Sequence, residues 1–253
     1  MSMKTTTKKR PSWKSRTKTV KGKRATRHPK MQALQQVTVY GDCPVPDVYN
    51  CVFTFAENYP ALPAIGNNFK DQQYYSGNSI FDPDITGATG TQPYYYDQLL
   101  GINTTGLYTT YNVYASQIEV EAVPSVSNNQ VCHIWVIPIS SSNVTLPGGS
   151  ATIINPDVYP RAKRMTIGTG ANANTVEKIT YYLPTYVHEN ITLERYHGCE
   201  EEYSALANTN PAFRSRWLIF VEPVDQVSQT VYLRVKIKYW SKLSERNQSV
   251  LES

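Results

Sequence analysis

The clearest hydrophobic pattern in the chain is the segment TVYLRVKIKYW, residues 230–240. Apolar and aromatic side chains take every second position, and basic side chains take several of the positions between them. A second segment, YASQIEVEAV at 114–123, alternates in the same way, with Ile118 and Val120 on one side and glutamates on the other. A period of two predicts β-strands with one buried and one exposed face.

The same texture of short apolar segments between Pro, Gly, Asn and Ser continues through the rest of the chain from Val37. Further strands are predicted at 47–57, 131–139, 161–167, 176–183 and 216–222, with a more polar eighth segment at 185–195. The segment 131–139 is nearly all apolar and is therefore expected to be buried on both faces. Eight such segments predict an antiparallel, all-β domain.

Three parts of the chain fall outside this strand pattern. The interval between the first two predicted strands is too long for a hairpin loop, so we expect a surface excursion there, with one short helical turn at 94–102. The polar segment after Trp240 is expected to fray. The resulting domain prediction is a disordered arm at 1–36, a β domain at 37–243 and a flexible tail at 244–253.

The chain divides into two parts of opposite net charge. Of 25 basic residues, 12 lie within residues 1–30, which contain no carboxylate, whereas the other 223 residues carry 13 basic and 20 acidic side chains. A polycationic segment joined to an acidic body indicates a partner that is nucleic acid or another anionic surface.

The candidate nucleic-acid-binding residues are the basic side chains of this arm, one aromatic side chain among them, and the basic side chains of the last strand. They are Lys4, Lys8, Lys9, Arg10, Trp13, Lys14, Arg16, Lys18, Lys21, Lys23, Arg24, Arg27, Lys30, Arg234, Lys236 and Lys238. Binding by such an arm is dominated by phosphate neutralisation, so we expect it to be independent of sequence and steeply salt-dependent. Trp13 would add one stacking contact with an exposed base.

Basic residues within the body are concentrated after residue 160. Residues 31–160 contain one basic residue, Lys70, against ten acidic ones. If the later strands share one side of the domain with the root of the arm, that side is basic and the opposite side acidic. The competing interpretation is that these are scattered surface charges.

Tyrosine is abundant, with 19 residues in the chain. A subset is predicted to lie at a subunit interface, where tyrosine is enriched: Tyr94, Tyr95, Tyr96, Tyr108 and Tyr111. The competing interpretation is that these rings fill the core of a β-sandwich.

Signatures of catalysis are absent from the sequence, so no catalytic residue, cofactor or metal is predicted. There is no GxSxG, GxxxxGK[ST] or HExxH motif. His197 and Cys199 come nearest to a pair of zinc ligands, and Glu200, Glu201 and Glu202 could supply oxygens to calcium, although a solvated loop explains them better.

The four cysteines, Cys43, Cys51, Cys132 and Cys199, lie far apart without a CxxC pair, and free thiols are expected. The charged N-terminus has no apolar signal-peptide core, and no apolar run is long enough to span a bilayer. We therefore expect a soluble protein in a reducing compartment, without membrane insertion.

Several blocks of the sequence resemble one family. QPYYYDQLLGI, GLYTTYNVYASQIEVEAV, PRAKRMTIGTG, NPAFRSRWLIFVE and TVYLRVKIKYWSKL are similar to successive blocks in capsid proteins of circular, Rep-encoding single-stranded DNA viruses, the circovirus-like group. More broadly, a polybasic arm before an eight-stranded antiparallel body resembles the coat proteins of small icosahedral viruses, which fold as a single jelly roll.

This resemblance implies a capsid protein without enzymatic activity that assembles with itself into an icosahedral shell of about 60 copies. It further implies arms that point inward onto packaged single-stranded DNA, a nuclear-import signal within the arm, and location in the virion and, during assembly, in the host nucleus. The surface receptor on the host is not implied by any of these residues.

Three different functions remain open beside this one. The arm has eight Lys and four Arg, whereas circovirus arms are Arg-rich, which leaves room for a coat protein of a small single-stranded RNA virus. A cellular nucleic-acid-binding module with a basic tail would also combine these features. A cupin-like enzyme shares the fold but is disfavoured, because a histidine cluster is missing.

Overall fold

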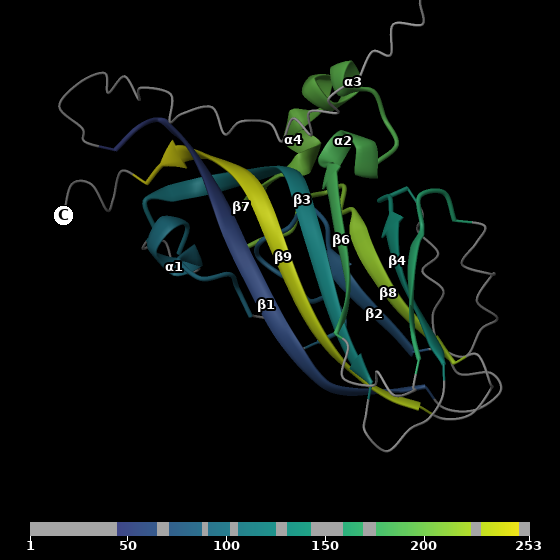
Figure 1. The fold of residues 1–253 in the computed structure, drawn as a ribbon. Helices are drawn as coiled ribbons and strands as arrows, with labels where there is room; N and C mark the ends of the chain where they lie inside the picture. Colours follow the sequence, from purple (N-terminus) through teal and green to yellow (C-terminus); the bar gives the residue numbers. More distant parts are fainter. Residues whose placement is uncertain are drawn as a thin grey trace, which may run out of the picture. The chain divides into compact units, whose positions relative to one another are not determined.

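The described residues of the domain form two antiparallel β-sheets and four short helices (Figure 1). The computed structural model describes residues 45–64, 71–87, 91–101, 106–124, 131–142, 159–168, 176–223 and 229–247. The predicted arm, Cys43 and most of the predicted tail lie outside the described residues.

The first sheet has the strand order β1-β9-β3-β6, and a short strand, β7, also pairs with β3. Its members are β1 (Val48–Ala64), β9 (Gln229–Arg246), β3 (Tyr108–Pro124), β6 (Glu177–Pro184) and β7 (Ser204–Leu206). The second sheet has the order β2-β8-β4-β5, with β2 (Asp71–Ser76), β8 (Arg216–Pro223), β4 (Cys132–Ile139) and β5 (Lys163–Ile167).

The pairing of the strands is nested. β1 pairs with β9, β2 with β8, β3 with β6 and β4 with β5, all antiparallel. Each outer pair encloses the next along the chain, and successive pairs alternate between the two sheets. Eight strands in two sheets with this connectivity form a jelly roll, so the predicted all-β, eight-stranded antiparallel jelly roll is confirmed.

The core lies between the two sheets and follows the alternation seen in the sequence. On β9, every second side chain from Val231 to Tyr239 is buried. On β3, Ile118 and Val120 are fully buried while the glutamates between them point outward. Each fully buried aliphatic side chain contributes about 1.5–3 kcal/mol relative to exposure in water, which fixes the register of these strands.

A second apolar cluster lies on the outward side of the β2-β8-β4-β5 sheet. Its buried members are Tyr74, Trp135, Ile137, Ile139, Leu218 and Phe220, and Ile85, Tyr159 and Ala162 pack against them. This explains why 131–139 is apolar throughout: β4 is buried on both faces, as predicted.

Three predictions about elements are corrected by the structure. The segment 185–195 is not a strand, because it contains α2 (Thr185–His188) and the start of α3 (Leu193–Gly198). The long interval after the first predicted strand is not only an excursion, because β1 extends to Ala64 and β2 lies within it. The tail does not fray after Trp240, because β9 continues to Arg246, beyond the predicted boundary at 243.

The remaining helices are α1 (Tyr96–Leu99), which confirms the helical turn predicted within 94–102, and α4 (Glu200–Tyr203). Helices α2, α3 and α4 gather at one end of the two sheets (Figure 1). At the start of α3, the Thr192 side chain accepts a hydrogen bond from the Arg195 backbone N–H, a normal N-terminal cap.

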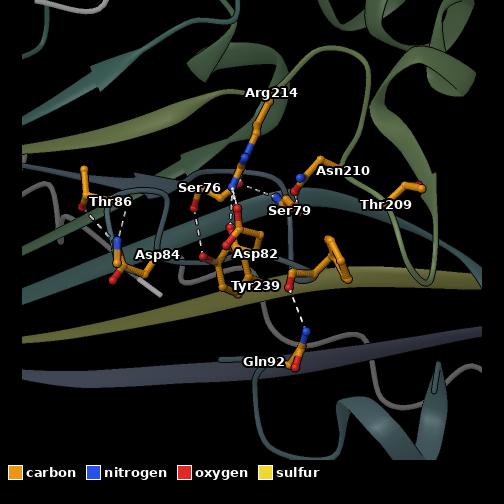
Figure 2. Close-up of polar contacts among 12 residues, drawn as sticks. Ser76, Ser79, Asp82, Asp84, Thr86, Gln92, Thr209, Asn210, Arg214 and Tyr239 are labelled. Carbon is orange, nitrogen blue, oxygen red and sulfur yellow. Dashed lines mark hydrogen bonds and ion pairs between the residues drawn. The ribbon is translucent and has the colours of Figure 1, made fainter. Parts of the chain in front are cut away.

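A polar cluster centred on Arg214 connects the segment after β2 with β9 (Figure 2). The guanidinium of Arg214 donates to Asp82 Oδ2 at 2.9 Å and to Ser76 Oγ at 3.2 Å, while the Tyr239 hydroxyl donates to the Ser76 backbone oxygen at 2.9 Å. Close by, the Ser79 hydroxyl lies 3.0 Å from the Tyr111 hydroxyl. These bonds satisfy groups that would otherwise be buried without partners.

Candidate nucleic-acid interface

The outward side of the β1-β9-β3-β6 sheet is exposed to solvent over much of its length, and this exposed part is here called the open face. Its side chains all come from alternate strand positions, and every one of them is exposed or half-buried. They are Val52, Thr54, Ala56 and Asn58 on β1; Tyr232, Arg234, Lys236, Lys238 and Trp240 on β9; Gln117, Glu119, Glu121 and Val123 on β3; and Lys178, Thr180 and Tyr182 on β6. The outward side of the other sheet, by contrast, is the buried apolar cluster.

The centre of the open face carries the basic residues that the sequence predicted. Lys236 lies between Ala56 and Glu119 on the neighbouring strands, and Lys238 lies between Thr54 and Gln117. Because β9 is flanked on both sides, these lysines project from the middle of the sheet and not from its edge.

Carboxylates share this face, which corrects the expectation that acidic and basic residues lie on opposite sides. Lys178 Nζ lies 2.7 Å from Glu119 Oε1 and 3.6 Å from Glu121 Oε1, and Arg234 Nη1 lies 3.7 Å from Glu121 Oε2. The hydrogen bond to Glu119 is the main cause of the raised pKa of Lys178. Lys178 and Arg234 therefore balance the two glutamates.

Lys236 and Lys238 are left without an ion-pair partner among the residues that the structure describes. Glu119, the cross-strand neighbour of Lys236, forms its ion pair with Lys178. An anionic ligand would gain most from contact with these two side chains.

One end of the open face is aromatic. Trp240 and Tyr182 meet edge to face with ring centroids 5.2 Å apart and an interplanar angle of 87°. The small side chain of Ala115, which is paired with Trp240 across the sheet, leaves space for this contact between β9 and β6. Tyr114 is the extra residue where the β3–β9 register shifts, and it is also exposed.

The opposite end of the face contains an open groove of about 540 Å³. It is lined by Asn58, Glu121, Val123, Val176, Tyr232, Leu233 and Arg234. Apolar side chains thus flank the basic centre of the sheet at both ends.

The other basic residues after position 160 do not join the open face. Arg214 belongs to the polar cluster of Figure 2, Arg164 stacks over Trp135 of the other sheet at 5.2 Å, and Lys163 lies 4.0 Å above the Tyr181 ring. Lys242 and Arg246 pair with Glu200 and Asp47. The prediction of one basic side therefore fits Arg234, Lys236 and Lys238 of β9 and does not fit the basic residues named above.

The arm residues of the predicted binding set, from Lys4 to Lys30 with Trp13, lie outside the described residues. The chain leads from them into β1, the strand paired with β9. Sequence reasoning missed Lys178, Tyr182 and Trp240 as members of the same face. The alternation of β6 carried a signal for the first two, because Ile179, Tyr181 and Leu183 fill the intervening core positions.

The predicted interface tyrosines divide into two groups. Tyr96, Tyr108 and Tyr111 are at most 2% exposed and fill the core, as in the competing interpretation, so their assignment to a subunit interface is corrected. Tyr94 and Tyr95 are 74% and 58% exposed, and their role at an interface stays a prediction.

No metal centre emerges from the described part of the chain, which contains no group of three or more His, Cys, Asp or Glu side chains arranged to hold an ion. Glu200 begins α4 and pairs with Lys242 at 3.0 Å. Cys51, Cys132 and Cys199 are free thiols, and burial raises the pKa of Cys51 and of Cys132 to about 12.

His188 and Glu189 are titratable side chains buried at the end of α2. Burial lowers the pKa of His188 to about 4, and its Nε2 lies 2.8 Å from the Arg216 backbone oxygen. Burial raises the pKa of Glu189, whose carboxylate accepts hydrogen bonds from the Ser141 backbone N–H at 3.0 and 3.1 Å. Both groups have structural partners and face away from the open face.

Among the described residues, no helix is both long and apolar enough to cross a membrane.

No protein family and no curated protein matches the sequence. Viral capsids are among the solved structures to which the chain is similar. The decameric BFDV capsid protein is 12% identical, with 78% of this chain and 99% of that chain covered and a TM-score of 0.41. A mud crab tombus-like virus structure is 10% identical, with 81% and 96% covered and a TM-score of 0.41, and the Macrobrachium rosenbergii nodavirus particle is 11% identical, with 82% and 99% covered and a TM-score of 0.39. Likeness at this level concerns the fold alone, and the jelly roll itself is established by the strand order of this chain.

Proposed function

We propose that the protein is a viral capsid protein that assembles with itself into a closed icosahedral shell and packages single-stranded DNA. Its role is structural and not catalytic. The observation that carries this proposal is the combination of a jelly-roll domain with a preceding segment of 12 basic and no acidic residues in its first 30. Jelly rolls occur chiefly in viral capsids, lectins and cupin enzymes, and neither a lectin nor a cupin has use for such a segment.

The cationic segment suits enclosure of a genome. Many copies bound in one shell would bring their arms to a common interior, where they offset the phosphate charge of the nucleic acid. The body does not compete for that role over most of its surface, because its 13 basic residues are outnumbered by 20 acidic ones. The same basic segment would serve as a signal for import into the host nucleus.

Tyr94 and Tyr95 are proposed as one contact between copies of the chain. Their rings lie 4.2 Å apart between centroids, and both are exposed. Tyr95 has a φ of 68°, a left-handed conformation that costs about 1–2 kcal/mol for a residue other than glycine. This conformation turns Tyr96 into the core and leaves two adjacent rings in solvent, where aromatic side chains act as anchors of interfaces.

Negative-stain microscopy of the purified protein tests the proposal directly. Uniform closed particles, of about 60 copies in the simplest icosahedral shell, are the expected result. A species that stays monomeric or dimeric at all concentrations would contradict it and favour a cellular nucleic-acid-binding module. Replacement of Tyr94 and Tyr95 by Ser should abolish particles while the circular dichroism spectrum stays unchanged.

The packaging role is tested with an arm-neutralised variant, in which the twelve Lys and Arg residues of 1–30 are replaced by Gln. This variant should lose most of the nuclease-protected nucleic acid. A scrambled arm with the same composition is the matched control, and it should protect as much as the parent because phosphate neutralisation is blind to sequence. Protected material that resists ribonuclease but yields to deoxyribonuclease after particle opening would confirm DNA, and the reverse would identify an RNA virus coat protein.

A further inference from the structure

We propose that the open face is a second nucleic-acid site, at which Tyr182 and Trp240 stack against unpaired bases while Lys236 and Lys238 bind the neighbouring phosphates. The proposal rests on the proposed packaging function and names a site within it that recognises single strands. The arm supplies charge alone apart from Trp13, whereas this face combines charge with fixed aromatic rings.

The geometry of the two lysines favours an extended strand as the ligand. Lys236 and Lys238 project from the same side of β9, two residues and about 6.8 Å apart. That separation is close to the spacing of successive phosphates in an extended single strand. Neither lysine has an ion-pair partner among the described residues, so a phosphate displaces no carboxylate.

The aromatic pair is held in place before any ligand binds. Trp240 is half-buried against its strand neighbours, and the edge-to-face contact with Tyr182 fixes both rings. Tyr182 is nevertheless 43% exposed, so a base has access to it. Stacking of bases on such rings requires that they are unpaired, because a duplex presents only its backbone and groove edges.

The position of the pair suits a ligand that also contacts the lysines. Trp240 follows Lys238 by two residues on the same side of β9, and Tyr182 is level with Lys238 across β3. A strand lying along β9 would therefore pass from the two lysines onto the two rings. The chain that precedes β1 enters the same sheet at the aromatic end, where Val48 pairs with Ser244.

Charge selects nucleic acid over another copy of this chain as the occupant. An interface core between protein copies is depleted of charged residues, yet the centre of this face carries lysines on its middle strand. A second copy would have to bury both lysines together with Glu119 and Glu121 of the same face, at a high desolvation cost.

The test measures oligonucleotide binding by fluorescence anisotropy with the full chain in its arm-neutralised form, so that the arm does not hide the face. The probes are a fluorescein-labelled oligothymidylate and a DNA duplex of the same length. The double variant Tyr182→Leu, Trp240→Leu should weaken oligothymidylate binding by about tenfold or more and leave duplex binding unchanged. Phe213→Leu, which alters an exposed ring elsewhere on the domain, is the matched control and should change neither.

The lysines are tested separately with Lys236→Gln, Lys238→Gln. This variant should weaken the binding of both probes and reduce the slope of log affinity against log salt for the single strand by about 1.4. Trp240→Phe should retain most of the affinity, because it keeps a stacking ring. Photo-crosslinking of bromodeoxyuridine-containing oligonucleotide to the parent chain should mark the peptides that contain Tyr182 or Trp240, and this measurement does not depend on the folding of any variant.

Equal loss of single-strand and duplex binding in the aromatic variant, or crosslinks confined to other peptides, would overturn the stacking site. Loss of particles with unchanged oligonucleotide affinity would overturn it too, and would identify the face as an interface between copies. These outcomes are separate from failure of the proposed function, which would appear as the absence of closed particles.

Discussion

Arg214 and Asp82 form an ion pair in which the guanidinium Nη2 lies 2.9 Å from the carboxylate Oδ2, and their side chains are only 16% and 12% exposed. The pair joins the segment after β2 to the residues that precede β8 (Figure 2). Removal of one partner leaves the other charge buried without compensation.

We therefore expect Arg214→Met to lower the free energy of unfolding by about 3–5 kcal/mol in urea titrations. The matched control is Arg246→Met, which breaks the pair with Asp47 at 71% exposure of the aspartate and should cost less than about 1 kcal/mol. Equal losses in the free energy of unfolding for the two substitutions would show that burial does not increase the contribution of the Arg214 pair.

Gly77 leaves space for two buried side chains. A Cβ at this position would lie 2.6 Å from Ser215 Oγ and 2.7 Å from His188 Cε1. Gly77→Ala should therefore destabilise the domain by about 1–3 kcal/mol in thermal or urea unfolding. Gly198→Ala is the control, because a Cβ there meets nothing within 4 Å, and it should not destabilise.

The double variant Gly77→Ala, Ser215→Ala removes the nearer of the two clashing atoms. It should recover part of the lost stability, although the contact with His188 remains. Purely additive losses in the double variant would argue against steric crowding as the cause.

His188 makes stability depend on pH. Its pKa is about 4 in the folded protein and 6.5 ordinarily, so between these values the unfolded chain binds more protons than the folded one. Stability should fall as the pH is lowered from about 6.5 to 4, by up to about 3 kcal/mol from this residue, and this contribution should level off below 4.

The measurement is urea unfolding of the parent and of His188→Gln across this range. The difference between their free energies of unfolding should change with pH. A difference that stays constant would show that His188 does not cause the pH dependence. Glu189 acts in the opposite direction, because its raised pKa makes the folded state bind the proton first, and it is present in both proteins.

The hydroxyl of the buried Tyr111 side chain donates to the Thr209 backbone oxygen at 2.8 Å. Tyr111→Phe should cost about 0.5–1.5 kcal/mol of stability, because this hydrogen bond is lost. Tyr94→Phe removes a hydroxyl that is in solvent and should leave the unfolding midpoint unchanged. A stability loss at Tyr94 equal to that at Tyr111 would contradict the division of the tyrosines into core and surface.

Alternation made β9 and β3 predictable from sequence, because one side of each strand faces the core and the other faces water. Lys236 and Glu119 mark the outward side of their strands, because a charged side chain buried without a partner would destabilise the fold. The same reasoning missed β2, whose sequence DQQYYS has no such contrast and depends on its pairing with β8. It also misassigned 185–195, where β-branched residues form short helices whose place is set by packing at the end of the sandwich.

Which residues lie together at the candidate site could not be predicted from the sequence, for a different reason. Tyr182 and Trp240 are 58 positions apart, and their contact exists only because β6 and β9 both pair with β3 in one register. Lys178 likewise offsets Glu119 across two strands. Such neighbours follow from long-range pairing, which the local pattern of a strand does not encode.

The pairing of β1 with β9 also governs when the domain can form during synthesis. β9 is the last strand of the jelly roll and lies between β1 and β3, so the first sheet lacks an inner strand until the final residues of β9 have left the ribosome. The basic segment is translated before β9, so its charge is present throughout that delay. An interrupted chain keeps its charge but has neither the lysines of β9 nor a closed core, so it stays unfolded.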